Sequence, residues 1–250
     1  MATFVLVHAA WGGGWEWRRV ARLLQSAGHR VFTPSLTGLG DRAHEITPDV
    51  GLETHVHDVV SLLDREDLDE VVLVGHSSAG MVITGAMDRA PGRIAHAVYL
   101  DAVVPGDGQA FVDLVPGDLV ERMLRQPAAR SATPWLVPPP FVVGELGMSA
   151  DDADWYVANV VPHPLRFFEQ PLALEGRWTE VPAITFVHCT QRSAYLASEE
   201  GAPDASFLAG FARRARDLGW GYRELATGHD PHITDPEILS ALLEELAPEP

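Results

Sequence analysis

Residues 70–80, which read E-V-V-L-V-G-H-S-S-A-G, constrain the fold of this chain most strongly. The four β-favouring apolar residues at 71–74 are typical of a short strand that is buried on both faces. This run ends abruptly at Gly75, and from Ser78 onward apolar residues recur at helical spacing. The chain is therefore predicted to turn from strand to helix within about three residues, with Ser77 at the apex.

The residues around Ser77 nearly match the pattern G-x-S-x-G, in which a serine occupies a strained turn and its hydroxyl stands above the carboxyl edge of a sheet. Ala79 stands where the pattern has its last glycine. Both flanks must be small because the strand and helix backbones nearly touch, and alanine is the next smallest residue. Serine and glycine are also ordinary loop residues, so a catalytic interpretation depends on finding partners for Ser77.

The composition narrows the class of protein. A chain of 250 residues with 46% hydrophobic and 21% charged residues fits an ordered globule with a sizeable core. The net charge of −17 argues against nucleic acid and anionic membrane surfaces as partners, because both attract basic patches. The chain contains no lysine, which excludes Schiff-base chemistry.

The single cysteine, Cys189, excludes an intrachain disulfide and fits a reducing compartment. It ends an apolar run, so we expect a packed side chain without reactivity. No basic amino-terminal region leads into a long apolar stretch, and no segment approaches the length of a membrane span. A cytoplasmic location is the resulting expectation.

Apolar runs of strand length alternate with segments of helical periodicity at both ends of the chain. This order predicts an α/β fold built on a mostly parallel, doubly wound sheet, with sites at the carboxyl ends of the strands. The expected strands cover residues 3–7, 30–33, 71–74, 94–100, 183–188 and 221–225, and the clearest helices cover 52–65, 207–218 and 236–246.

The alternation breaks down between residues 104 and 180, where prolines interrupt short helical pieces rich in aromatic side chains. An insertion of this length is not a simple loop. We expect residues 1–250 to form a single domain, with a helical cap inserted at about 105–180 and folded over the edge of the sheet. Most of the aromatic side chains are expected to hold the cap together, and a few to line a pocket.

A serine at such a turn needs a histidine that can accept its proton, and the usual chain order is serine, acid, histidine. Eleven histidines compete. His229 is favoured because the segment A-T-G-H-D-P-H follows the last predicted strand and precedes the last helix, at the carboxyl edge of the sheet. His232 is interpreted as a loop or helix-start residue, and His76, inside the turn, as structural.

The acidic partner is less clearly marked, since no carboxylate promptly follows the predicted strand 183–188, where it is usually found. Asp101 directly follows the strand 94–100, also at the carboxyl edge. A short side chain at a strand end is better preorganised than one on a long loop, so we favour Asp101. The alternatives in the long loop are, in order, Asp204, Glu200 and Glu199.

An oxyanion hole needs two backbone amides aimed at the position where negative charge develops. We expect one from Ser78, which follows Ser77 at the start of a helix, where unpaired amides and the helix dipole favour an anion. We expect the other from the glycine-rich loop that follows the first strand, at Ala10.

Four motifs together resemble a known family: V-H-A-A-W-G-G-G-W-E-W, P-S-L-T-G-L-G-D-R-A-H, V-G-H-S-S-A-G-M-V and T-G-H-D. They look like the bacterial branch of the α/β-hydrolase superfamily that is related to plant hydroxynitrile lyases, plant methylesterases and pyrethroid-type carboxylesterases. The resemblance covers both ends of the chain and weakens in the cap. It implies the α/β-hydrolase fold, with Ser77 as nucleophile, His229 as base, and the amides of Ala10 and Ser78 as the oxyanion hole.

The resemblance does not carry over the acid, because the family's aspartate follows the strand that ends near Cys189, where this chain has Gln191 and Arg192. The hydroxynitrile lyases of the family also place a lysine directly after the catalytic histidine and a threonine after the histidine of the first loop. This chain has Asp230 and Ala9 instead. A carboxylate at that position would repel cyanide, which disfavours cyanohydrin cleavage.

These observations together predict a serine carboxylic ester hydrolase that acts on a small hydrophobic or aromatic ester without a cofactor or a metal. The alternatives are a hydroxynitrile lyase or a lactonase on the same scaffold, or a small-molecule binding protein with a degraded triad. The expected partner is the small-molecule ester, with neither nucleic acid nor membrane, and a homodimer is left open.

Overall fold

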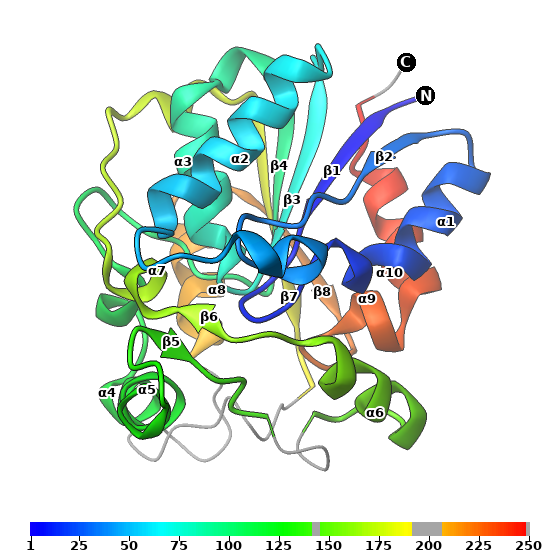
Figure 1. Cartoon of the computed structure of the whole chain (residues 1–250). Coiled ribbons are helices and arrows are strands. Elements are labelled where there is room, and N and C mark those ends of the chain that lie inside the picture. Colours follow the sequence, from blue (N-terminus) through cyan, green and yellow to red (C-terminus); the bar gives the residue numbers. More distant parts are fainter. Residues whose placement is uncertain (142–145, 192–206, 249–250) are drawn as a thin grey trace.

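A six-stranded parallel sheet forms the centre of the protein (Figure 1). The computed structural model describes residues 1–141, 146–191 and 207–248. The strand order is β2-β1-β3-β4-β7-β8, which confirms the predicted doubly wound α/β sheet. The strands are β1 (Thr3–Val7), β2 (Arg30–Phe32), β3 (Val71–His76), β4 (Ile94–Leu100), β7 (Ala183–Cys189) and β8 (Gly221–Leu225).

Helices cover both faces of this sheet (Figure 1). Alternate residues of β3 point to opposite faces, so Val71 and Leu73 belong to one apolar core and Val72 and Val74 to the other. The first core includes α2, α3 and α8, and the second includes α1 and α10. Burial on both faces explains why residues 71–74 are all apolar. The helices are α1 (Arg18–Ser26), α2 (Leu52–Arg65), α3 (Ala79–Arg89), α8 (Leu208–Asp217) and α10 (Pro236–Glu245).

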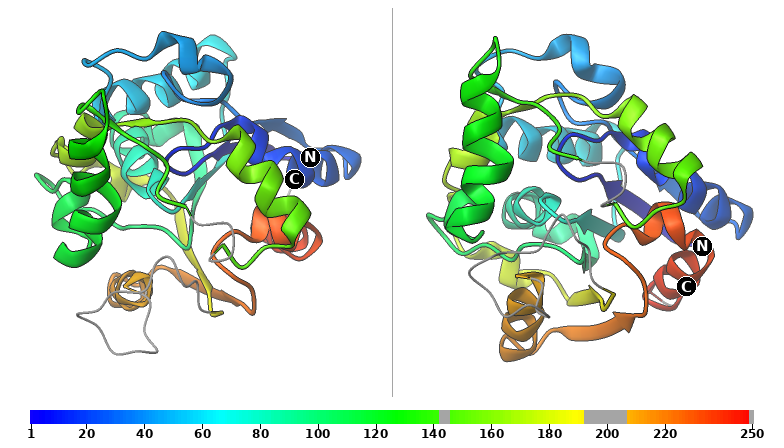
Figure 2. Two further views of the ribbon diagram at one scale, coloured as in Figure 1. Left: turned by 60° about the horizontal axis from the view of Figure 1, so that its bottom comes forward. Right: turned by 90° about the horizontal axis from the view of Figure 1, so that it is seen from below.

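The segment between β4 and β7 contributes short elements that lie beyond the carboxyl ends of the strands (Figure 1). Seen from below, α4 and α5 lie on one side of these ends and α6 on the other (Figure 2). The elements are α4 (Gly117–Val120), a π-helical turn (Glu121–Arg125), α5 (Gln126–Arg130), β5 (Leu136–Val137), α6 (Ala150–Asn159), β6 (His163–Pro164) and α7 (Leu165–Glu169). These elements belong to the segment for which a cap is predicted.

The remaining helical turns are short and connect the larger elements. Helix α9 (Pro231–Thr234) precedes α10 directly. The 3-10 turns are Gly14–Trp17, Gly40–Glu45, Pro91–Arg93, Phe111–Asp113 and Arg177–Glu180.

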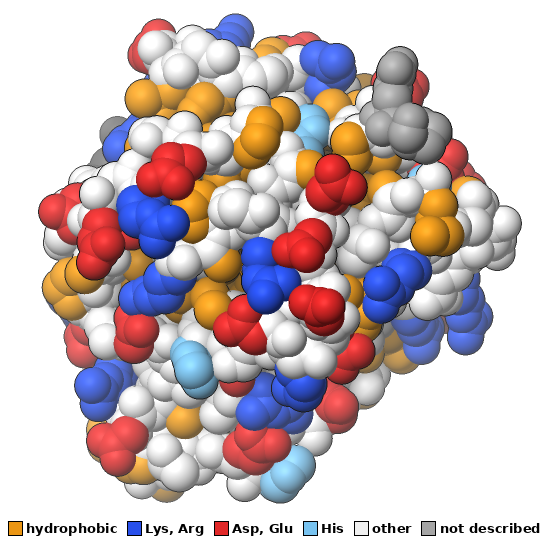
Figure 3. Space-filling view, turned by 90° about the horizontal axis from the view of Figure 1, so that it is seen from above, with side chains coloured by type: hydrophobic (Ala, Val, Ile, Leu, Met, Phe, Trp, Pro, Cys, Tyr) orange, Lys and Arg blue, Asp and Glu red, His pale blue; other side chains and the backbone are white. Residues whose placement is uncertain are grey.

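Cys189 lies at the end of β7 and is 5% exposed within the second core, as expected for a packed residue. On the face opposite the cap, arginines lie among acidic side chains (Figure 3). Within the described residues, no helix has both the length and the apolar character needed to cross a bilayer.

The close approach that the serine turn requires lies one residue beyond Ala79. A Cβ added to Gly80 would overlap the carbonyl oxygen of Val103, whereas Ala79 is accommodated in the core at 1% exposure. The departure from G-x-S-x-G at Ala79 is therefore compatible with the turn, because the residue that must lack a side chain is Gly80.

We predict that Gly80→Ala destabilises the fold by about 1–3 kcal/mol, because the new methyl group forces the α3 backbone away from Val103. Urea denaturation measures this change. The matched control is Gly92→Ala, whose Cβ would meet nothing within 4 Å, and which should stay within about 0.5 kcal/mol of the parent. Equal stability of the two variants would contradict the tight contact at Gly80.

Candidate active site

Ser77 lies at the apex of the turn between β3 and α3 in a conformation that few non-glycine residues adopt. Its φ angle is 55°. Its amide donates a hydrogen bond to the carbonyl of Leu100 at 3.1 Å, and its carbonyl accepts one from the amide of Val103 at 3.1 Å. These bonds hold the strained turn against the end of β4.

Asp101 lies between those two partners of Ser77 and is also strained, with φ of 42°. Its amide donates to the carbonyl of Val187 at 2.7 Å, which ties it to β7. One carboxylate oxygen, Oδ1, accepts the amide of Cys189 at 3.3 Å, and Oδ2 accepts Nδ1–H of His229 at 2.7 Å. The structure thus brings Asp101 and His229 together, each 4% exposed.

Asp101 stabilises the charged form of the His229 imidazole. Burial alone would lower the pKa of His229, but the hydrogen bond and charge of Asp101, together with the charge of Asp230, outweigh burial and leave the pKa raised. With Nδ1 bound to Asp101, proton transfer by His229 would use the other ring nitrogen, Nε2.

The usual position of the acid after β7 is occupied by a residue that supports the histidine loop. Nε2 of Gln191 donates to the carbonyl of Ala226 at 2.7 Å, and its backbone amide donates to the carbonyl of Thr227 at 2.9 Å. Both contacts hold the segment that leads to His229. The alternative acids Asp204, Glu200 and Glu199, and also Arg192, lie outside the described residues.

An oxyanion hole is expected from the backbone amides of Ala10 and Ser78. In this structure the Ala10 amide is already hydrogen-bonded. The amide of Ala10 donates to Oγ of Ser78 at 2.8 Å, a bond between buried residues. Ser78 precedes α3 directly. The Ser78 hydroxyl thus occupies the donor that an oxyanion would use, a contact that the sequence did not predict.

A pocket opens beside these residues and has largely apolar walls. Ser77, Ser78, Ala10 and His229 all line it, and so does Asp230. The apolar walls come mostly from the segment between β4 and β7, and include Phe111, Val115, Leu119, Met123, Phe141 and Tyr156. Asp101 lies behind His229 and is not among the lining residues.

The loop after β1 is held in place by histidines that do not face Ser77. Nδ1 of His8 donates to the carbonyl of Ala9 at 2.8 Å, and Nε2 accepts the amide of Leu36 at 3.0 Å. Burial lowers the pKa of His8 to about 4, so this ring stays neutral. Trp11 is tied to the cap, because its amide donates to Nδ1 of His163 at 3.1 Å.

His76 has a structural contact with the segment that carries the predicted base, in line with the role expected for it. Its Nε2 donates to the backbone carbonyl of His229 at 2.8 Å. No local pattern could have indicated this contact, since the two residues are separated by 153 positions.

Comparison with known proteins decides the family. The sequence model of the alpha/beta hydrolase family matches residues 4–242, which is nearly the whole chain. The chain belongs to this family. A carbendazim hydrolyzing esterase from Nocardioides sp. (strain SG-4G) is 39% identical and aligns with 98% of this chain and 100% of its own length. The resemblance inferred from the motifs is therefore confirmed.

Two further matches extend over most of the chain. An alpha-hydroxynitrile lyase of Arabidopsis thaliana is 26% identical over 82% of this chain and 81% of its own length. The solved structure of an extracellular alpha/beta-hydrolase from a Paenibacillus species superposes with a TM-score of 0.85 at 24% identity, covering 100% of both chains. At this identity, the structural likeness concerns the fold alone.

We predict that Asp101→Asn lowers kcat/KM for an activated ester by about 10³- to 10⁴-fold, because an amide cannot hold His229 in the required tautomer and charge state. Initial rates with p-nitrophenyl acetate measure this loss. The matched control is Asp204→Asn, with Glu199→Gln and Glu200→Gln beside it, and these variants should retain activity. If a control variant loses activity while Asp101→Asn keeps a normal rate, the acidic partner of His229 is in the loop after β7 and not at Asp101.

Proposed function

We propose that this chain hydrolyses carboxylic esters with Ser77 as nucleophile, His229 as general base and acid, and Asp101 as the residue that orients the imidazole. The chain is an enzyme of the esterase type, given its family and its full-length similarity to a carbendazim hydrolyzing esterase. The observation that most supports the proposed residues is the 2.7 Å bond between Asp101 and His229, beside a pocket that Ser77 and His229 both line.

The proposed reaction has two stages. Oγ of Ser77 attacks the carbonyl carbon of the ester while Nε2 of His229 takes the hydroxyl proton. The carbon–oxygen bond to the alcohol then breaks, and His229 passes the proton to the departing oxygen. Water repeats the same steps on the acyl-enzyme, with its proton going to His229 and then to Ser77. Asp101 stabilises the imidazolium in both stages, consistent with the raised pKa of His229.

The negative charge of the tetrahedral intermediate would be held by the amides of Ser78 and Ala10. The Ala10 amide becomes available only when the Ser78 hydroxyl gives up the bond it accepts from that amide. Substrate binding would therefore include rotation of the Ser78 side chain away from Ala10. Exchange of one such hydrogen bond costs about 1 kcal/mol.

The pocket favours an ester with an apolar or aromatic group. Its walls carry Trp11, Phe111, Phe141 and Tyr156 together with aliphatic side chains. Such walls bind through burial of apolar surface, worth roughly 25 cal/mol per Å², and through ring contacts. The Nocardioides relative is named for the hydrolysis of carbendazim, which is therefore one candidate substrate to try.

The other candidate functions have less support. Cyanohydrin cleavage is disfavoured because Asp230, buried at 5% exposure, lines the pocket directly after His229 and would repel cyanide. A binding protein without catalysis would not need a buried aspartate on Nδ1 of the pocket histidine. Product analysis with a cyanohydrin and with lactones separates a lyase or a lactonase from an esterase.

We predict that Ser77→Ala lowers kcat for p-nitrophenyl acetate by at least about 10⁴-fold, because the acyl-enzyme cannot form. The matched control is Ser61→Ala, on the exposed side of α2, which should leave the rate unchanged. Full activity in the Ser77 variant would refute the proposed mechanism.

We predict that Ser78→Ala raises kcat/KM by about fivefold, because the Ala10 amide no longer has a competing acceptor, a gain equivalent to roughly 1 kcal/mol. The same variant should lose about 1 kcal/mol of stability, since the buried amide is left without its partner. Ser78→Thr keeps the hydroxyl and should show neither change. A lower rate in Ser78→Ala would mean that the hydroxyl itself assists the reaction.

A further inference from the structure

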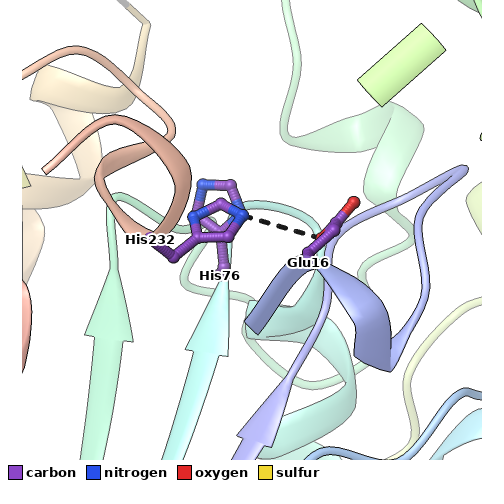
Figure 4. A group of neighbouring side chains, drawn as sticks. All are labelled: Glu16, His76 and His232. Carbon is purple, nitrogen blue, oxygen red and sulfur yellow. Dashed lines mark ion pairs between the residues drawn. The ribbon is translucent and has the colours of Figure 1, made fainter. Parts of the chain in front are cut away.

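A second cluster of ionisable side chains adjoins the pocket, which one of its members, His76, lines, and it has no part in the proposed reaction (Figure 4). It consists of Glu16 in the 3-10 turn after β1, His76 at the end of β3, and His232 in α9. The exposed fractions of these residues are 1%, 1% and 0%. Three segments far apart in the sequence thus place two imidazoles and a carboxylate together in the interior.

The polar atoms of this cluster are largely without hydrogen bonds. Among the described residues, no partner with hydrogen-bonding geometry reaches Nδ1 of His76 or either ring nitrogen of His232. The same holds for the carboxylate oxygens of Glu16, although the backbone of Ala9 and the hydroxyl of Tyr156 lie close enough to influence the pKa of this carboxyl group. Buried polar groups are almost always satisfied, and a buried carboxylate needs either a proton or a compensating positive charge. A proton alone would neutralise Glu16, but the buried nitrogens of His76 and His232 would still lack partners, which a cation or water in the cluster would supply.

The spacing of the atoms favours a cation. One ligand atom from each residue lies within 4.8 Å of the others. Nε2 of His232 and Oε2 of Glu16 are 3.7 Å apart, which is too long for a hydrogen bond. Two ligands of a tetrahedral zinc ion, each at about 2.0–2.1 Å from the metal, are about 3.3 Å apart. A small closure of this pair would give the separation of two zinc ligands.

His76 has the hydrogen bonding typical of a metal-binding histidine. Its Nε2–H donates to the carbonyl of His229 at 2.8 Å, which leaves Nδ1 as an unprotonated acceptor facing no protein donor. Metal-ligating histidines usually donate their other N–H to a carbonyl or a carboxylate in this way, which fixes the tautomer. The contact also connects the cluster to the backbone of the predicted base.

The surrounding chain makes room for the other two side chains. A Cβ on Gly12 would overlap Oε1 of Glu16, so this glycine of the first loop leaves space for the buried carboxylate. The ring of His232 packs against Trp17, with centroids 4.8 Å apart, which fixes its orientation. Rotamers locked by packing are what a preorganised metal site requires.

The neighbouring group formed by His76, His229 and Asp230 also has ligand atoms within 4.8 Å of one another. It is less suited to a resident ion, because an ion on Nε2 of His229 would remove the base from the proposed reaction.

We propose that Glu16, Nδ1 of His76 and His232 bind one divalent transition-metal ion of the zinc class, with water completing its coordination. Two imidazoles and a carboxylate are ligands that suit zinc. The ion would join the loop after β1, the end of β3 and the start of α9, and through His76 it would fix the segment that carries His229. Its role is structural, and it does not depend on the proposed esterase function.

Metal content tests the proposal directly. Tag-free protein is produced in zinc-supplemented medium, desalted without chelator and analysed for zinc. We expect about one zinc ion per chain in the parent, together with a thermal midpoint that falls on prolonged chelation and recovers with added Zn²⁺. Replacement by Co²⁺ should give the visible absorption bands of a tetrahedral site. Zinc-free parent protein whose midpoint does not respond to Zn²⁺ would overturn the proposal in favour of water.

Variants locate the ion. Glu16→Gln keeps the shape of the side chain and should reduce zinc retention at least about tenfold, as should His232→Met. The exposed control His44→Ala should retain zinc like the parent, and so should His229→Ala. Zinc that is lost in His229→Ala and kept in Glu16→Gln would place the metal in the pocket instead and overturn the proposal. The Co²⁺ spectrum of the parent decides the question if a variant fails to fold.

Discussion

The backbone hydrogen bonds between the serine turn and the end of β4 are the constraint on which the rest of the site depends. Ser77 donates to Leu100 and accepts from Val103, the residues on either side of the Asp101–Ala102 pair. Ser77 and Asp101 both have positive φ, and these hydrogen bonds stabilise their strained backbone conformations. Strand β4 also pairs with β7, and β7 pairs with β8, which leads into the loop that carries His229. The position of this loop is therefore linked to the serine turn through the sheet.

This arrangement would let an aspartate directly after β4 serve as the proposed acid, a place that is usually filled after β7. The carboxyl ends of neighbouring parallel strands share one edge of the sheet, so an acid on either strand can reach the same imidazole. Asp101 is short and anchored by its own amide, whereas the segment after β7 uses Gln191 to hold the histidine loop. Separate residues thus carry the charge and support the loop.

Much of the fold could be predicted from the sequence because burial on both faces leaves a strong local signal. Residues 71–74 and 94–100 had to be apolar strands, and α2 was predicted with its observed bounds. The proposed pairing of Asp101 with His229 was predicted from their places after strands, and the two side chains are hydrogen-bonded. The elements between β4 and β7 could not be predicted in detail, because prolines interrupt the periodic pattern of apolar residues there. The contacts of Ser78 with Ala10, and of Glu16 with His232, join distant residues and leave no periodic pattern.

The most direct test of the central assignment is to label the protein with a fluorophosphonate and locate the adduct by mass spectrometry. The chain has no lysine, so trypsin cuts after Arg65 and Arg89 and releases residues 66–89 with the whole serine turn. Fragmentation of this peptide distinguishes Ser77 from Ser78. We predict stoichiometric phosphonate on Ser77 and its loss in Asp101→Asn at matched labelling times. An unlabelled protein, or an adduct on another residue, would contradict the account.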